Sequence, residues 1–360
     1  MDSPWQLGCV WNDSIARCLK SQNSGLDFGD LALTNLQLIK NQELISIIFP
    51  VHNGEEYLAE AIESVVSQTD KNWELLILDD GSTDNSVELL ESLIDQTADS
   101  RVILHRNPAN LGLPATLNIG ISHARGKFIC RFDADDIMLS KRLEIQRKFL
   151  DNNPHIGIVG SAAIAIDSCG ETLRRITMPA THSEIVCKEF SGLASAFIHP
   201  SIMVRRNLFT EFNFRYDESF KTSQDKKLWF EMLQHTQGAN ISEPLIKYRK
   251  HPDSASIAKR SQQQQNATSV CKMWLEALLQ EDVSDAETKA FIDTKPKLGP
   301  SDSTAIRFTL KVLRHVKDKF GIERSSIRKM KARLLMRIAR SGSIGLLMKI
   351  ALTGFSSKNS

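Results

Sequence analysis

The stretch WELLILDDGSTDNS at residues 73–86 joins an apolar run to a polar turn. The run WELLIL is rich in residues that favour strands, and it ends in two aspartates before the turn residues GSTD. Val87, Leu90 and Ile94 then recur at helical spacing. The stretch therefore predicts a strand, a tight turn and an amphipathic helix.

The same pattern of strand, loop and helix occurs three more times around this stretch. The other predicted strands are ISIIFP at 45–50, RVILHR at 101–106 and KFICRFD at 127–133. Each is followed by apolar residues at helical spacing. Strands that alternate with helices of 10 to 15 residues imply βαβ units and a parallel sheet covered on both faces. Such sheets bind ligands beyond the carboxyl ends of their strands.

Polar and acidic side chains follow three of these predicted strands at the point where each strand ends. They are His52 and Asn53, Asp79 and Asp80, and Asp133, Asp135 and Asp136. Three carboxylates within four residues repel one another unless a cation or basic groups compensate. Carboxylate oxygens are the ligands that Mg²⁺ and Mn²⁺ prefer. The last cluster predicts either a metal site that bridges ligand phosphates or an acidic turn that caps the next helix.

The DDGSTD turn is the second candidate for ligand binding. Gly81 allows a tight turn before a helix that begins near Thr83 or Asp84. The carboxylate of Asp80 can accept the imide N–H of a uracil or thymine ring. We interpret Asp84 as a helix N-cap instead.

The composition is that of a folded enzyme with about two domains. The chain has 360 residues, of which 41% are hydrophobic and 24% charged, which excludes disordered and fibrous proteins. The six cysteines form no CxxC pair, which argues against a disulfide framework or a zinc cluster. No apolar run is long enough to span a membrane, and no secretory signal peptide can be identified, so we expect a cytoplasmic protein.

Charge is distributed unevenly along the chain. The net charge is +2, but residues 307–360 carry +12 and residues 1–306 carry −10. Within 325–340, the apolar residues Ile327, Met330, Leu334 and Ile338 are flanked by six Lys and Arg residues. Such a helix can lie on the inner face of an anionic membrane, or it can pack on its own protein with a solvated basic face. Nucleic acid is a poorer partner, because few aromatic residues lie among these charges.

The chain divides into three predicted regions. Residues 1–43 form an N-terminal extension, and residues 44–256 form the α/β domain. Residues 257–360 form a basic helical region with helices at 269–280, 304–320 and 325–340. The QQQQ tract at 262–265 is interpreted as a linker or an exposed helix face.

Five motifs resemble glycosyltransferase family 2, whose members have the GT-A fold. They are PVHNG at 50–54, LDDGSTDNS at 78–86, NLGLPATLNIG at 110–120, RFDADD at 131–136 and SQDKKLWFEM at 223–232. Their order and spacing also match, over about residues 44–252. The resemblance implies an α/β, Rossmann-like, mostly parallel sheet flanked by helices, with an appended C-terminal helical region. It also implies a nucleotide-binding half at 44–136 and an acceptor half at 137–256.

The resemblance implies a role for each matching residue. The implied catalytic base is Asp225. The implied nucleotide-binding residues are Pro50, His52, Asn53, Asp80 and Asp133. The implied metal ligands are Asp135, Asp133 and His251. The acceptor or phosphate side is assigned to Asp136, Gln224, His199 and Arg249. Two positions depart from the family pattern, because His52 stands where Tyr is common and Gln224 stands where Glu is usual.

The predicted function is transfer of a sugar from a nucleotide diphosphate sugar to a saccharide acceptor. The resemblance implies a UDP-sugar as donor, a hexosyl group, Mn²⁺ or Mg²⁺ as cofactor, inversion at the sugar, and surface polysaccharide or lipid-linked oligosaccharide synthesis. The expected acceptor is therefore a saccharide, either free or linked to a lipid. The absence of GxGxxG and GxxxxGK[ST] motifs disfavours a nicotinamide enzyme and a P-loop NTPase. The absence of a nucleophile motif such as GxSxG fits direct displacement without a covalent intermediate. The alternative is a non-catalytic membrane-surface or interaction protein that acts through its basic C-terminal helices.

Overall fold

The computed structural model describes residues 44–191, 194–251, 260–292 and 303–340. The predicted extension at 1–43 lies outside the described residues, as does the predicted boundary between 256 and 257.

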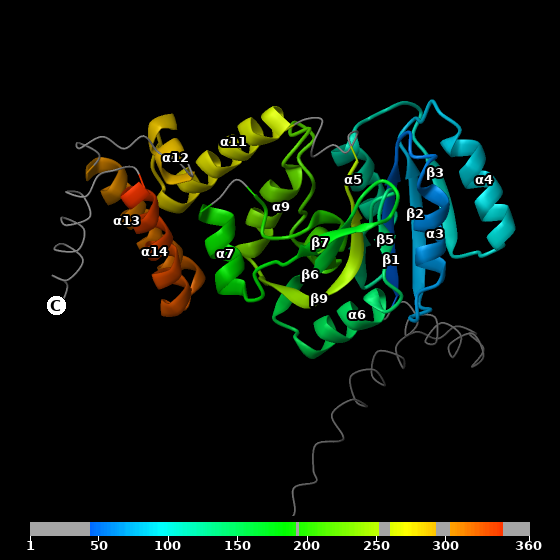
Figure 1. Cartoon of the computed structure of the whole chain (residues 1–360), viewed down its shortest axis with the longest axis horizontal. Coiled ribbons are helices and arrows are strands. Elements are labelled where there is room, and N and C mark those ends of the chain that lie inside the picture. The colour runs from blue at the N-terminus through cyan, green and yellow to red at the C-terminus, as the bar shows by residue number, and fades with distance from the viewer. Residues whose placement is uncertain (1–43, 192–193, 252–259, 293–302, 341–360) are drawn as a thin grey trace, which may run out of the picture. The chain divides into compact units, whose positions relative to one another are not determined.

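Four parallel strands form the first half of the sheet (Figure 1). They are β1 (Ile45–Val51), β2 (Trp73–Asp79), β3 (Val102–Arg106) and β4 (Phe128–Arg131). The connecting helices are α3 (Leu58–Val66), α4 (Ser86–Thr97) and α5 (Leu113–His123). All four predicted βαβ strands are therefore confirmed, and their carboxyl ends lie at one edge.

The second half of the sheet is mixed in direction. It contains β5 (Ile137–Met138), β6 (Ile156–Ile166), β7 (Thr172–Ile176), β8 (Met203–Arg205) and β9 (Gln237–Arg249). The strand order is β3-β2-β1-β4-β8-β6-β9-β5, with β7 paired to β6. The short β8 runs antiparallel to both β4 and β6, while β6 and β9 are parallel. The long return strand β9 carries the chain back to the edge where the first four strands end.

Side chains of the central strands alternate between two cores. On β1, Ile45, Ile47 and Phe49 face one core, and Ile48 faces the other. Helices α3, α4 and α6 (Arg142–Asn152) cover the first core. Helices α5, α7 (His182–Ser191), α8 (Asn207–Glu211) and α9 (Gln224–Leu233) cover the second. Burial on both faces explains why these strands are continuous apolar runs rather than alternating ones.

The structure describes four helices in the C-terminal region. They are α11 (Arg260–Leu279), α12 (Asp285–Ile292), α13 (Ser303–Phe320) and α14 (Arg324–Arg340). Their apolar faces form a third core, which also contains Phe190 of α7 and Phe230 of α9. The predicted helices at 269–280, 304–320 and 325–340 are thus present, and residues 262–265 are an exposed face of α11.

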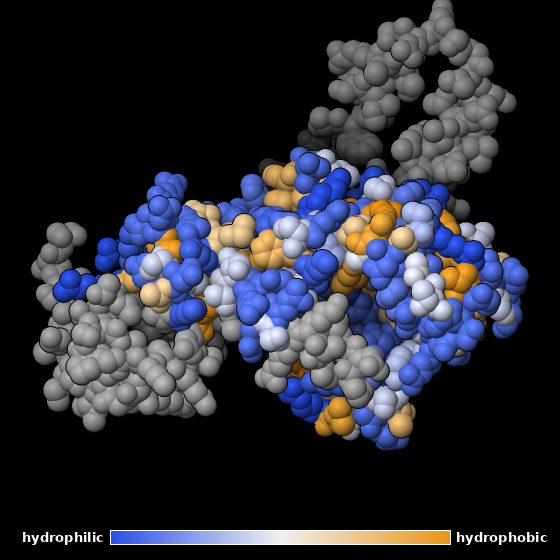
Figure 2. All heavy atoms as spheres, turned by 90° about the horizontal axis from the view of Figure 1, so that it is seen from above, coloured by the Kyte–Doolittle hydropathy of each residue, from blue (hydrophilic) through white to orange (hydrophobic). Residues whose placement is uncertain are grey.

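The basic helix α14 packs on its own protein through the part of its apolar stripe that can be described. Ile327 and Met330 are buried in the third core, while Arg328 and Lys331 are exposed. The side chains of residues 333–340 lie outside the described ones. No helix in the described part of the chain is both long and apolar enough to cross a membrane. The face drawn in Figure 2 is mainly hydrophilic, with its hydrophobic residues in separate groups.

Candidate active site

A cavity of about 700 Å³ opens at the carboxyl ends of β1 and β4. It brings together nine of the residues predicted from the sequence: Pro50, His52, Asn53, Asp133, Asp135, His199, Gln224, Asp225 and His251. Three predicted residues, Asp80, Asp136 and Arg249, are not among those that line it. The predicted clusters at the ends of the first and fourth strands therefore do meet in one hollow.

The loop after β1 is held in place by the turn after β2. Asn53 has a φ of 52°, an unusual value for a residue with a side chain. Its Oδ1 accepts a hydrogen bond of 2.8 Å from the backbone N–H of Thr83, and its own N–H donates to Ser82 Oγ at 3.0 Å. His52 follows β1 directly, and its Nε2 lies 2.9 Å from Asn110 Nδ2. These contacts place the imidazole of His52 at the rim of the cavity.

Asp80 organises a loop rather than lining the cavity. Its Oδ1 accepts hydrogen bonds of 2.9 Å from Asn107 Nδ2 and the Leu111 N–H, and its Oδ2 accepts one of 2.9 Å from the Gly112 N–H. Burial acts to raise the pKa of Asp80, but these hydrogen bonds together lower it below its usual value. Gly81 makes the close approach possible, because a Cβ there would lie 2.7 Å from the backbone of Ala109. Contact of Asp80 with a nucleotide base stays a prediction.

The three carboxylates after β4 form a compact acidic cluster. Each of Asp133, Asp135 and Asp136 offers an oxygen, and these oxygens lie within 4.8 Å of one another. The guanidinium of Arg131 forms a bidentate ion pair with the carboxylate of Asp133. Withdrawal from water is the main reason why the pKa of Asp133 is raised to about 6 and that of Asp136 well above its usual value. A cation at this position would relieve the repulsion between the three groups.

The donor set fits a hard divalent cation. His251 Nε2 lies 3.1 Å from Asp135 Oδ2, so the predicted imidazole ligand does reach the acidic cluster. The Oδ2 atom of Asp136 is buried and has no hydrogen-bond partner in the described part of the chain. Carboxylate oxygens with one imidazole suit Mg²⁺ or Mn²⁺. Asp133, Asp135 and His251 are the residues that would hold the ion.

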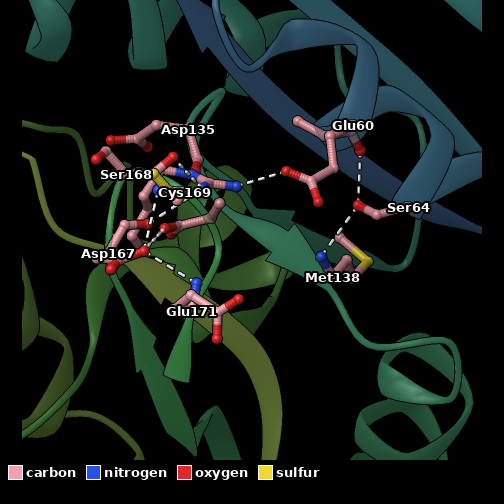
Figure 3. A network of polar contacts seen from close by, with 11 residues as sticks. Glu60, Ser64, Asp135, Met138, Asp167, Ser168, Cys169 and Glu171 are labelled. Atoms are coloured by element: carbon pink, nitrogen blue, oxygen red, sulfur yellow. Dashed lines mark hydrogen bonds and ion pairs between the residues drawn. The ribbon is translucent and has the colours of Figure 1, made fainter. Parts of the chain in front are cut away.

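Arg249 and Asp136 do not line the cavity, and their place on the acceptor or phosphate side stays a prediction. The guanidinium of Arg249 donates to the carbonyl oxygens of Asp135, Asp167 and Ser168 and to the carboxylate of Glu60. Figure 3 shows these four residues converging from α3, the acidic loop and the turn between β6 and β7.

These partners engage all three guanidinium nitrogens of Arg249. The side chain is only 3% exposed. Its backbone N–H also donates to Asp136 Oδ1 at 2.8 Å, which keeps Asp136 in the interior, 1% exposed. Arg249 therefore holds the loop that carries Asp135 and Asp136 in place through hydrogen bonds.

Asp225 lies in the first turn of α9 and faces the cavity. Burial raises the pKa of its carboxyl group, although a hydrogen bond from the Lys226 N–H acts in the opposite direction. A raised pKa suits a general base, because a more basic carboxylate accepts a proton more readily. The departure at the preceding position is also visible in the structure, because Gln224 lines the same cavity with its Oε1 buried and unpaired within the described residues.

His199 lines the cavity with one nitrogen already engaged. Its Nε2 lies 2.8 Å from Tyr216 Oη, and its ring packs edge-on against Trp229. Burial lowers the pKa of His199 well below its usual value, so the ring is neutral at pH 7. A neutral imidazole held in this way can form a hydrogen bond to a ligand, but it does not attract an anionic ligand by charge.

Three side chains that contact the predicted site residues or their neighbours were not selected from the sequence. Arg131 lies two residues before Asp133, and this proximity was a usable signal. Tyr57 packs between Arg249, 4.4 Å away, and the ring of His251, 5.5 Å away, and burial raises its pKa to about 12. Glu189 forms an ion pair with Lys226, which lies 37 residues later in the sequence. No pattern of neighbouring residues in the sequence indicates this pair.

Comparison with known proteins decides the family. The family model described as Glycosyl transferase family 2 matches residues 46–213. The EpsE protein of Bacillus subtilis is 34% identical over 219 residues, which cover 60% of this chain and 76% of EpsE. The chain belongs to glycosyltransferase family 2. An uncharacterized glycosyltransferase of Haemophilus influenzae is 31% identical over 244 residues, which cover 64% of this chain and 73% of that protein.

Solved glycosyltransferases of the GT-A type share the fold of this family 2 member. Residues 1–349 of S. aureus TarS, in complex with UDP, superpose with a TM-score of 0.52 at 16% identity, covering 87% of this chain and 93% of that one. The mannosyltransferase PcManGT from Pyrobaculum calidifontis, in complex with GDP-Man and Mn²⁺, gives 0.50 at 13% identity, covering 91% and 88%. At these identities the likeness concerns the fold alone. The predicted GT-A fold with a C-terminal helical region is confirmed.

Proposed function

We propose that this glycosyltransferase moves a hexosyl group from a UDP-sugar to a saccharide acceptor, with inversion and with Mn²⁺ or Mg²⁺ as cofactor. The observation that carries the proposal is that Asp225 and the acidic pair Asp133 and Asp135 line one cavity at the strand ends. UDP is favoured as the nucleotide because the S. aureus TarS structures contain UDP and UDP-GlcNAc. The Mn²⁺ in complexes of PcManGT and GalNAc-T7 supports the cofactor.

Each side chain has one task in this reaction. Asp225 accepts the proton of the acceptor hydroxyl while the new glycosidic bond forms and the bond to the diphosphate breaks. A single displacement of this kind inverts the configuration at the sugar carbon. When bound, the divalent ion neutralises charge on the leaving diphosphate. Asp133, Asp135 and His251 would hold that ion, and Arg131 limits the repulsion between the first two carboxylates.

Ligand-dependent stabilisation tests the donor site. We expect UDP with Mn²⁺ to raise the melting temperature, and GDP, dTDP or CMP to do so less. A ligand at about 100 times its Kd stabilises by roughly 2.7 kcal/mol. EDTA should abolish the shift, and NMR of the product should show the opposite anomeric configuration from the donor. A shift that is equal for all four nucleotides would overturn the choice of UDP, and retained configuration would overturn Asp225 as a base in direct displacement.

The basic face of α14 favours a second proposal, that the enzyme works at the inner face of an anionic membrane on a lipid-linked acceptor. Arg324, Arg328 and Lys331 are exposed, and none of them has a salt bridge in the described part of the chain. Cationic residues near such a surface contribute about 1 kcal/mol each. Replacing all three by Glu should abolish binding to vesicles that contain 30% phosphatidylserine, and unchanged binding would remove this proposal. This second proposal includes the predicted cytoplasmic location and the predicted role in polysaccharide or lipid-linked oligosaccharide synthesis.

A further inference from the structure

The first turns of α11 contact the segment that leads into the catalytic helix α9. Ser223 Oγ donates to the carbonyl oxygen of Gln263 at 3.1 Å. Asn266 Nδ2 donates to the carbonyl oxygen of Thr222 at 3.1 Å and to its Oγ1 at 2.9 Å. Ser223 has a φ of 62°, which is unfavourable for a residue with a side chain, and these contacts help to hold it. Helix α11 thus fixes the backbone directly before Asp225.

Buried packing also fixes how α11 lies against α9. The ring of Trp274 on α11 stacks on Phe230 of α9, with 4.2 Å between their centroids. The ammonium of Lys226 lies 4.5 Å from the centroid of the Trp274 ring. All three side chains are buried, so the start of α11 has a defined position relative to Asp225.

Two glutamines, one from each helix, line the cavity beside Asp225. Gln224 is 5% exposed, and its Oε1 has no hydrogen-bond partner among the described residues. Leaving a buried acceptor without a donor costs free energy. Gln263 lines the same cavity with an exposed side chain, whereas its neighbours Gln262 and Gln264 do not line it. The amide of Gln263 is therefore open to a ligand in the cavity that Asp225 also lines, whereas Gln224 Oε1 is withdrawn from the solvent-accessible space of the cavity.

We propose that Gln263 forms a binding subsite for a hydroxyl group of a neutral saccharide acceptor, so that α11 determines acceptor specificity. The inference rests on the proposed sugar transfer. A side-chain amide donates and accepts hydrogen bonds without charge, and a sugar hydroxyl does the same. The C-terminal helical region then belongs to the catalytic unit.

Acceptor kinetics test this subsite with a matched control on the same helix. The full chain is assayed with UDP-GlcNAc, UDP-glucose and UDP-galactose as donors, Mn²⁺, and neutral p-nitrophenyl glycosides as acceptors. Gln263→Ala should raise the KM for the glycoside about tenfold, the effect of losing roughly one hydrogen bond, with less than about twofold change in the KM for the donor. Gln262→Ala, an exposed change one residue away, should leave both constants unchanged.

The outcomes separate the subsite from the proposed function. Equal glycoside KM values for Gln263→Ala and Gln262→Ala would overturn the subsite, as would an equal rise in the donor KM. If the wild-type enzyme releases UDP from a donor with Mn²⁺ but glycosylates none of the neutral glycosides, the assignment to neutral saccharides is wrong while the donor site stands. If the chain neither binds UDP nor releases it from any of these donors, the proposed function fails, and the subsite falls with it.

Discussion

The ammonium of Lys226 lies 2.7 Å from the carboxylate of Glu189, and both side chains are almost fully buried, 2% and 1% exposed. The pair joins α9 to α7 directly beside Asp225. Glu189 also accepts hydrogen bonds from Ser195 Oγ and from the Ala196 N–H. The buried ion pair thus connects α9 to the 195–196 segment, where Ser195 lines the cavity.

Lys226→Met should destabilise the protein by about 3 to 5 kcal/mol, because it leaves the charge of Glu189 buried without its partner. Urea unfolding measures the loss. Adding Glu189→Gln to Lys226→Met should recover much of it, since the uncompensated charge is then gone. Lys227→Met is the matched control, because the partly exposed pairs of Lys227 with Glu231 and Asp217 contribute at most about 1 kcal/mol. Similar losses for Lys226→Met and Lys227→Met would contradict the importance of the buried pair.

Asp225→Asn should reduce the rate of sugar transfer by at least about a hundredfold, because the amide cannot accept the proton of the acceptor hydroxyl. Binding of UDP and Mn²⁺ should remain, since Asp225 is not one of the expected metal ligands. Isothermal titration calorimetry measures binding, and UDP release measures the rate. Glu231→Gln, on the same helix, should retain wild-type kinetics. A transfer rate close to that of the wild type in Asp225→Asn would exclude Asp225 as the base.

Asp135→Ala should abolish the dependence of UDP binding on Mn²⁺, because it removes both a carboxylate ligand and the partner of His251. The loss in UDP affinity should match the loss that EDTA causes in the wild-type protein. The matched control is Asp167→Asn, which replaces an acid of the neighbouring turn outside the acidic cluster. If Mn²⁺ still strengthens UDP binding in Asp135→Ala to the wild-type extent, the metal site lies elsewhere.

The free energy of unfolding should fall as the pH drops from 7 to 5, in part through His182. Burial lowers the pKa of His182 from 6.5 to about 4, and its Nδ1 accepts a hydrogen bond from the Gly238 N–H. Between these two pKa values the unfolded chain binds a proton that the folded chain does not, so stability is complete above pH 6.5 and is lost toward pH 4. By pH 5, His182 has lowered the free energy of unfolding by about 2 kcal/mol relative to pH 7. His182→Asn keeps an acceptor and removes the titration, so urea unfolding should show a smaller decline; an equal decline would exclude His182.

The strands and most cavity residues could be predicted because their signals are local. The apolar runs, the turn residues after them and the helical spacing all lie within about 25 residues of one another. The rule that parallel strands end at one edge then brings His52, Asp133 and Asp135 together. Asp225 and His251 were placed by the family resemblance, and the structure puts both in the same cavity.

The interpretations of Arg249 and Asp80 depended on contacts that the sequence does not show. Arg249 is a basic residue near a proposed diphosphate site, but its guanidinium is occupied by Glu60, 189 residues away in sequence, and by the turn at 167–168. Asp80 satisfies N–H groups of a loop some 30 residues further on. In both cases the charged group has hydrogen-bond partners that are distant in the sequence. Such partners can be identified only from the three-dimensional structure.

The shared third core has a consequence for how the protein unfolds. Phe190 and Phe230 belong to the helices that cover the sheet, yet they pack on Trp274 of α11. Unfolding of the C-terminal helices alone would expose these two rings to water. The C-terminal helices therefore cannot unfold independently without weakening the packing of α7 and α9. Trp73 reports on the strands and Trp274 on the helices. Their fluorescence should therefore change together in a single cooperative transition.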